Sequence, residues 1–228
     1  MFKGKVVAFA LMLVVATSVC AGDVSDCRST ATVVGCAQMK LSVCPAGDFE
    51  LIRDACGVGI AAYIEVIARD ASGNPIPGIP WTDYWLNSMD PAKQLTLCAS
   101  PFAADSLTGS NGRTTFTGRV AAGGCNANAA VGYTGIWWAI QAKPLKGPYP
   151  SCTNNVPLNV IVKGVDLTGV GGVPDGIVNL SDLVIFTPSY NKVLGAVGYN
   201  ACCDYTDDNI CNLSDFSSFG KHYQHSCW

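Results

Sequence analysis

The chain has 228 residues, 12 of them cysteine, and a formal net charge of −3. This length suits one large domain or two small ones. The acidic balance argues against binding to nucleic acid or to anionic membranes, whose negative charge would repel the protein.

The first 21 residues have the pattern of a secretory signal peptide. Lys3 and Lys5 precede a short apolar run, and Val19-Cys20-Ala21 resembles a cleavage site. The run is too short to span a bilayer, and no other segment predicts a transmembrane helix. Lipidation at Cys20 is the alternative to simple cleavage. We therefore expect a protein that is secreted or held at the cell surface, with a mature chain beginning near Gly22.

Eleven cysteines remain after cleavage, and in an exported chain they predict disulfide bonds. Zinc binding is the competing interpretation, but no Cys-x-x-Cys pair occurs and both histidines lie in the last seven residues. Spacing favours the pairs Cys27–Cys36, Cys44–Cys56, Cys98–Cys125 and Cys203–Cys227. The odd count leaves one thiol that is free or bonded to another chain.

Residues 22–164 are rich in strand-forming residues, with turn signals every ten residues or so. The segment Gly59–Arg69 alternates, with Ile60, Ala62, Ile64, Val66 and Ala68 on one side. Further strands are predicted at 80–86, 94–99, 113–121, 130–142 and 156–162, with two or three more in 28–54. Short strands at this spacing predict a two-sheet sandwich.

Two segments carry a resemblance to a known fold. Glu65-Val-Ile-Ala-Arg-Asp-Ala-Ser-Gly-Asn-Pro-Ile-Pro-Gly78 and Ser110-Asn-Gly-Arg-Thr-Thr-Phe116 are similar to parts of bacterial Ig-like secreted domains, over about 60–142. The resemblance implies a β-sandwich and no enzymatic activity, because such domains are mostly spacers, adhesin stalks or binding modules.

Tryptophans are the candidate ligand contacts in this region. On a strand, Trp81 and Trp85 would share a face, and one of the adjacent Trp137 and Trp138 would point outward. An exposed row of rings suits stacking on the sugar rings of a polysaccharide; packing in the core is the alternative. The candidate stacking residues are Trp81, Trp85 and Trp138.

Residues 204–215 have the spacing of a twelve-residue calcium loop. Calcium takes six to eight oxygen ligands, and such a loop supplies them from positions 1, 3, 5, 7, 9 and 12. Those positions hold Asp204, Thr206, Asp208, the Ile210 carbonyl, Asn212 and Asp215. An acidic surface turn without a metal is the alternative.

An internal repeat supports the calcium interpretation. Asn-Leu-Ser-Asp occurs at 179–182 and again at 212–215, and Val165-Asp-Leu-Thr168 matches Cys203-Asp-Tyr-Thr206. Together the repeats resemble a dockerin module over about 165–228. The resemblance implies two loop–helix units related by a pseudo-twofold, each holding one Ca²⁺. In the first unit it implies the ligands Asp166, Asp175, the Ile177 carbonyl, Asn179 and Asp182.

The first loop carries five extra residues, 169–173, so we expect its calcium site to be the weaker one. Type I dockerins usually have a Ser-Thr pair for cohesin recognition before the last ligand, whereas both repeats here have Leu-Ser. We expect the two following helices to pack together through Leu183, Val184 and Phe186 on one side and Phe216, Phe219 and Tyr223 on the other.

No catalytic pattern is found in the sequence. It lacks a Gly-x-Ser-x-Gly elbow, a phosphate-binding loop and a dinucleotide fingerprint, and it has only two glutamates. We therefore predict a non-catalytic structural protein, stabilised by calcium and disulfides, that self-assembles into oligomers or filaments. The alternatives are a cellulosome-like surface module that docks to a cohesin and contacts carbohydrate, and a hydrolase with an unrecognised site.

Overall fold

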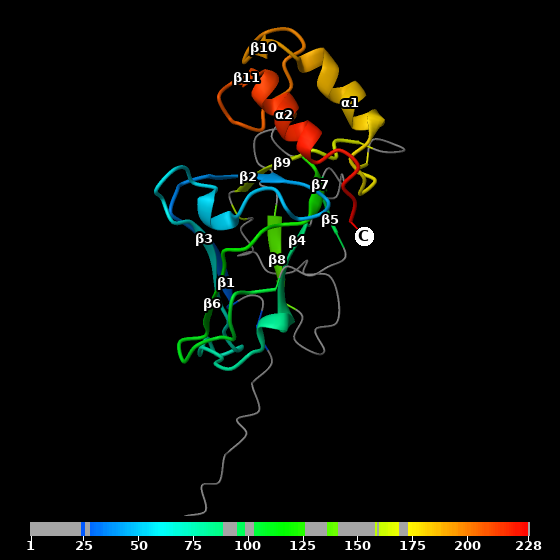
Figure 1. Ribbon diagram of the computed structural model, residues 1–228. Helices are drawn as coiled ribbons and strands as arrows, with labels where there is room; N and C mark the ends of the chain where they lie inside the picture. Colours follow the sequence, from blue (N-terminus) through cyan, green and yellow to red (C-terminus); the bar gives the residue numbers. More distant parts are fainter. Residues whose placement is uncertain are drawn as a thin grey trace, which may run out of the picture.

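The fold was analysed in a computed structural model, which describes residues 24–25, 28–88, 95–98, 103–125, 136–140, 158, 160–168 and 173–227. The protein is mainly β with two short helices, as the sequence predicts. Figure 1 shows the helices grouped with two short strands, β10 and β11, at one end, above the remaining strands. Its strands are β1 (Thr30–Val34), β2 (Met39–Val43), β3 (Tyr63–Ile67), β4 (Tyr84–Ser88), β5 (Leu95–Leu97), β6 (Arg113–Phe116), β7 (Ala122–Gly124), β8 (Ile136–Ile140), β9 (Val160–Gly164), β10 (Lys192–Val193) and β11 (Ile210–Cys211), and its helices are α1 (Leu180–Phe186) and α2 (Leu213–Lys221).

Strand β3 lies at the centre of an antiparallel sheet of order β1-β3-β6. Its alternation is the predicted one, because Ala62, Ile64, Val66 and Ala68 are at most 1% exposed. Ile60 is 45% exposed, since it lies before the strand begins at Tyr63. The two segments that resemble Ig-like domains meet in this sheet, where Glu65 lies opposite Thr115.

The other strands form two-stranded pairs. Strands β4 and β8 and strands β5 and β7 pair antiparallel, whereas β2 and β9 pair parallel, with Met39 opposite Val160 and Val43 opposite Gly164. The buried faces of β2, β3 and β9 share one apolar core, to which Leu41, Ile64 and Val162 contribute. The Ig-like order of a complete two-sheet sandwich stays a prediction.

Two predicted strands begin or end elsewhere. The segment 80–86 opens with a 3₁₀ turn over Trp81–Asp83, and β4 starts only at Tyr84. Pro80 has its φ fixed in the helical range and its carbonyl accepts a hydrogen bond from the Asp83 amide at 3.0 Å, which favours a turn there. Of the segment 113–121, only Arg113–Phe116 forms a strand, β6, and the next strand, β7, begins at Ala122.

The described disulfides are Cys36–Cys56, Cys98–Cys227 and Cys125–Cys202. Disulfides are therefore confirmed, as is typical of an exported protein, but all four pairs predicted from spacing are wrong. Spacing favours short loops, whereas two of these bonds join cysteines 129 and 77 residues apart that the fold brings together. Cys44, Cys203 and Cys211 are buried and carry no disulfide in the described part of the chain.

A second cluster of buried side chains lies between the two helices and the loops before them. Phe186 and Phe219 are 1% and 2% exposed, and their ring centroids are 5.8 Å apart. Leu183 packs against this cluster as predicted, but Val184 does not, because it is 64% exposed. Neither helix of the described chain is long and apolar enough to cross a membrane.

Candidate calcium-binding loops

The loop before α2 brings three carboxylates together. One oxygen from each of Asp204, Asp208 and Asp215 lies within 4.8 Å of the others. Asp204 and Asp215 are buried, and Asp208 is exposed at the mouth of the group. Negative charges this close repel one another strongly, so the arrangement favours a bound cation. A set made only of oxygens suits a hard ion such as Ca²⁺.

Backbone amides curl the loop around these carboxylates. Asp204 accepts hydrogen bonds from the amides of Asp208 at 3.2 Å and Asn209 at 3.1 Å. Asp215 accepts from both the amide and the hydroxyl of Thr206, at 2.9 and 3.0 Å. Asn209 has φ +68°, at loop position 6. Calcium loops of this length turn sharply at that position, where glycine is usual.

Asn212 begins α2. Its Oδ1 accepts a hydrogen bond from the Ser214 amide at 2.7 Å, and Asp215 Oδ2 accepts one from the Asn212 amide at 2.8 Å, which completes a capping box. The side-chain nitrogen of Asn212, Nδ2, faces the loop and lies 3.2 Å from Asp208 Oδ2 and 3.4 Å from the Ile210 carbonyl. Position 9 of a calcium loop often acts through a water molecule, and this geometry suits that role.

The first loop repeats most of the hydrogen bonds of the second loop. Asp182 accepts from the amides of Leu167 and Thr168, as Asp215 does from Thr206. Asn179 caps α1 through the Ser181 amide, and its Nδ2 lies 3.3 Å from Asp175 Oδ2 and 3.2 Å from the Ile177 carbonyl. Gly176 takes the place of Asn209, with φ +81°. The sequence repeat is therefore also a repeat of hydrogen bonds.

Asp166 takes the place of Asp204 in this repeat, in spite of the insertion at 169–173. Its Oδ2 accepts a hydrogen bond from the Gly176 amide at 2.8 Å. The residues 169–172 of the insertion lie outside the described chain. Strand β7 packs tightly against Asp166, since a Cβ added at Gly123 would lie 2.0 Å from Asp166 Oδ2. Only glycine leaves room for the carboxylate there.

Asp166 also shows why a cation fits the first loop. The residue is fully buried, and its Oδ1 has no hydrogen-bond partner. Burial, together with the nearby charges of Asp182 and Asp175, raises the pKa of Asp166 to about 7. Burial likewise raises the pKa of Asp182. A buried carboxylate oxygen without a partner is rare and costly, and a bound Ca²⁺ would satisfy it.

The two loops still differ. Among the described residues, three carboxylates converge within 4.8 Å in the second loop but not in the first. The second loop is also contacted by a buried lysine of β9, which the sequence analysis did not single out. Lys163 of β9 is 5% exposed, and its Nζ lies 2.8 Å from Asp207 Oδ1 and 3.7 Å from Asp204 Oδ2. The signal in the sequence was a single lysine within the otherwise apolar strand β9, which indicates a buried charge that needs an acidic partner.

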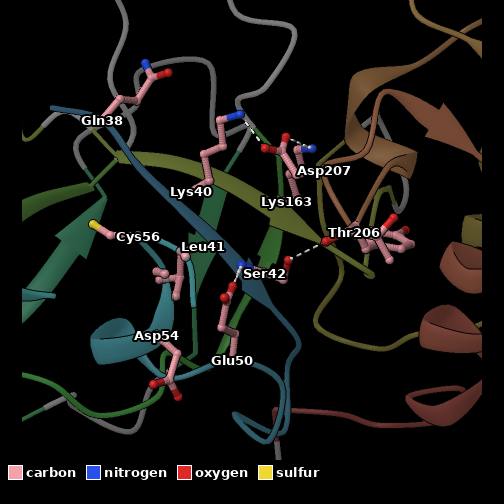
Figure 2. A pocket seen from close by; sticks show the side chains of 13 residues that line it. Gln38, Lys40, Leu41, Ser42, Glu50, Asp54, Cys56, Lys163, Thr206 and Asp207 are labelled. Carbon is pink, nitrogen blue, oxygen red and sulfur yellow. Dashed lines mark hydrogen bonds and ion pairs between the residues drawn. The ribbon is translucent and has the colours of Figure 1, made fainter. Parts of the chain in front are cut away.

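Figure 2 shows a cleft where strands β2 and β9 meet the second loop. Its volume is about 390 Å³. Lys40 of β2 and Lys163 reach Asp207 from one wall. Ser42 donates from its Oγ to the Tyr205 carbonyl at 3.2 Å, and its amide donates to Glu50 Oε2 at 2.8 Å. The strand pair β2–β9 is thus bonded directly to the second loop.

The sugar-stacking prediction is wrong in placing Trp81 and Trp85 on one strand face. Trp81 lies in the 3₁₀ turn, not on a strand, so it shares no strand face with Trp85 of β4. Trp81 is 51% exposed. Trp138 of β8 lies opposite Leu86 in the β4–β8 register. The side chains of Trp85 and Trp138 are outside the described part of the structure.

No protein-family model matches the chain, and no curated protein matches it in sequence. Searches of solved structures find two mutant type II cohesin–X-dockerin complexes from Acetivibrio cellulolyticus, one altered at its C-terminal interface and one at its N-terminal interface. Each is 12% identical, with a TM-score of 0.29 over 87% of this chain and 97% of that chain. A TM-score of 0.29 does not establish a shared fold, so the properties of those complexes are not transferred to this chain.

Proposed function

We propose that this chain is a secreted, non-catalytic protein whose residues 165–228 bind two calcium ions and dock onto a cohesin-like partner. The observation that carries the calcium half is the hydrogen-bond repeat of two acidic loops, each with two buried aspartates. Binding energy at such loops contributes to folding, because the ion removes the repulsion between the carboxylates. The part before residue 165 then acts as the carrier domain.

An apolar surface on the two helices supports the docking half of the proposal. Leu180 and Leu213 occupy the same position in the two repeats and are 63% and 66% exposed. Phe216 is 42% exposed beside them, and a hollow of about 420 Å³ runs from Leu183 and Phe186 to Leu213 and Phe216. Apolar side chains gathered on one face mark interaction sites. These helices lie at the free end of the molecule (Figure 1).

Calcium content tests the first half. Native mass spectrometry of the secreted protein in calcium should show two ions per chain, and Asp208→Ala should remove one. Asp208 is the exposed member of its trio, so its loss should leave the fold intact. Asp83→Ala, an acidic residue outside both loops, is the matched control. Equal ion content in Asp208→Ala and the control would contradict the proposal.

Docking is tested by surface plasmon resonance on immobilised type I and type II cohesins. We expect calcium-dependent binding to at least one of them, lost in Leu213→Asp. Val58→Asp is the control, because Val58 is fully exposed but outside the helices. Binding that survives Leu213→Asp, or no binding to either cohesin in calcium, would refute this partner. Self-assembly and contact with carbohydrate through Trp81 stay predictions.

A further inference from the structure

The only two histidines of the chain come together with a cysteine and an aspartate from the other end of the sequence. Ligand atoms of all four residues lie within 4.8 Å of one another. The cluster includes none of the calcium-loop ligands, although the His225 carbonyl accepts a hydrogen bond from the Val178 amide of the first loop at 2.9 Å. We propose that it is a structural Zn²⁺ site, with the ligands Cys44, Asp48, His222 and His225.

The distances suit a tetrahedral metal. Zinc binds nitrogen and carboxylate oxygen at about 2.0–2.2 Å, so neighbouring ligands in a tetrahedron are about 3.3–3.5 Å apart. The two histidine Nδ1 atoms are 3.4 Å apart, and each lies 3.3 Å from Asp48 Oδ1. Cys44 Sγ lies 3.9 Å from His225 Nδ1. Three of the six ligand–ligand edges therefore match already, and a fourth is slightly long.

The edge between Cys44 and Asp48 is the one that a metal would change. Cys44 Sγ donates to Asp48 Oδ1 at 2.7 Å, a thiol–carboxylate hydrogen bond. Burial and this carboxylate raise the pKa of the Cys44 thiol to about 11. Zinc binding would release the thiol proton and move the two groups apart by less than about 1 Å. Asp48 has a half-exposed side chain and can make that shift.

The ligands are held in place before any metal arrives. Cys44 and Asp48 flank a turn closed by the Gly47 amide, which donates to the Cys44 carbonyl at 3.0 Å. The His225 amide donates to the His222 carbonyl at 3.0 Å, closing a second turn. The His222 ring stacks on Phe49, with centroids 4.4 Å apart. Two short backbone turns thus present two ligands each to a common point.

The donor set selects zinc over calcium. Imidazole nitrogen and thiolate sulfur bind borderline and soft metals, whereas calcium takes oxygen ligands. Four protein ligands leave no open position, which is typical of a structural and not a catalytic site. The sequence argument against zinc relied on the missing Cys-x-x-Cys pattern. Here Cys44 and Asp48 form one pair of ligands and His222 and His225 the other, and neither pair has the Cys-x-x-Cys pattern. The two pairs lie 174 or more residues apart.

The test uses the full secreted protein, purified without thiol reductant so that the disulfides stay intact, and stripped of metal. Zinc is added in the presence of excess calcium and counted by inductively coupled plasma mass spectrometry. We expect one zinc per chain. The His225→Gln variant should bind zinc at least about 100-fold more weakly, because even the loss of an outer-shell partner lowers metal affinity about 10–100-fold. Lys221→Gln, next to the site but not a ligand, is the matched control.

Cobalt supplies the second measurement. Co²⁺ in the same site should give the intense visible bands of tetrahedral coordination and a sulfur-to-cobalt charge-transfer band, and Cys44→Ser should abolish the latter. Calcium content and far-ultraviolet circular dichroism of each variant show whether it is folded. Zinc at background level in the wild-type chain, or tight zinc binding that survives both His225→Gln and Cys44→Ser, would overturn the proposal.

Discussion

Lys163→Met is the sharpest test of how the second loop is held. The substitution keeps an unbranched side chain on β9 and removes the ammonium group that lies between Asp204 and Asp207. The Lys163 side chain is 6% exposed and that of Asp204 is 1% exposed, so this charge pair is buried. In the absence of calcium, the variant leaves Asp204 without its neighbouring positive charge.

Removing one partner of a buried ion pair costs about 3–5 kcal/mol of unfolding free energy. We expect a loss at the lower end of this range, because Asp204 keeps hydrogen bonds from the Tyr199 hydroxyl at 2.8 Å and from two loop amides. For a chain of this length, about 3 kcal/mol lowers the melting temperature by roughly 6–12 °C. In calcium the ion supplies the missing positive charge, so the loss should be smaller. By linkage, the difference equals the calcium-binding free energy that the variant gains.

The assay is thermal unfolding followed by circular dichroism, in calcium and in calcium-free buffer. Lys40→Met is the matched control, since Lys40 pairs with Asp207 from a side chain that is 47% exposed. Exposed pairs contribute at most about 1 kcal/mol, so the control should change little in either buffer. An equal loss of stability for Lys163→Met with and without calcium would refute the reasoning.

Three other results are expected. In urea, Phe219→Ala should lower the free energy of unfolding by about 3–5 kcal/mol, and the exposed Val184→Ala by less than about 0.5 kcal/mol; similar values would contradict the packing described. Burial raises the pKa of Asp166 to about 7, so the folded calcium-free protein binds this proton more tightly than the unfolded chain. Its melting temperature should therefore fall as the pH rises from about 4 to about 7, and Asp166→Asn should flatten the profile; an unchanged profile in this variant would rule Asp166 out. If the protein self-assembles, electron microscopy should show ordered polymers that chelation disperses, whereas a monomer in both conditions would exclude assembly.

The two acidic loops and their hydrogen bonds could be predicted from the sequence because their geometry is local. Twelve consecutive residues fix the spacing of Asp204, Asp208 and Asp215, and the Asn-Leu-Ser-Asp repeat supplies its own helix cap. The same locality explains the correct face of β3. Trp81 was misplaced because alternation alone does not show that Pro80 starts a turn.

The contacts that sequence reasoning missed all join distant segments. Lys163 meets Asp204 across 41 residues, and Cys44 meets His225 across 181. No spacing rule covers such pairs, since the parallel pairing of β2 with β9 decides which side chains reach the second loop. The predicted disulfide pairs are wrong for the same reason, because cysteines that are close in sequence are not the ones that are close in space.

The two long-range disulfides have a mechanical consequence. A force applied to α1 and α2 would pull on the end of the molecule that Figure 1 shows above the other strands. Without cross-links, that tension would run through the single backbone connection after β9. Cys125–Cys202 and Cys98–Cys227 add two covalent paths from just after β7 and β5, one to Cys202 between the two helices and one to Cys227 beyond α2. Load on the helices is thereby shared among three attachments, so the end cannot be peeled away from the strands while the disulfides hold.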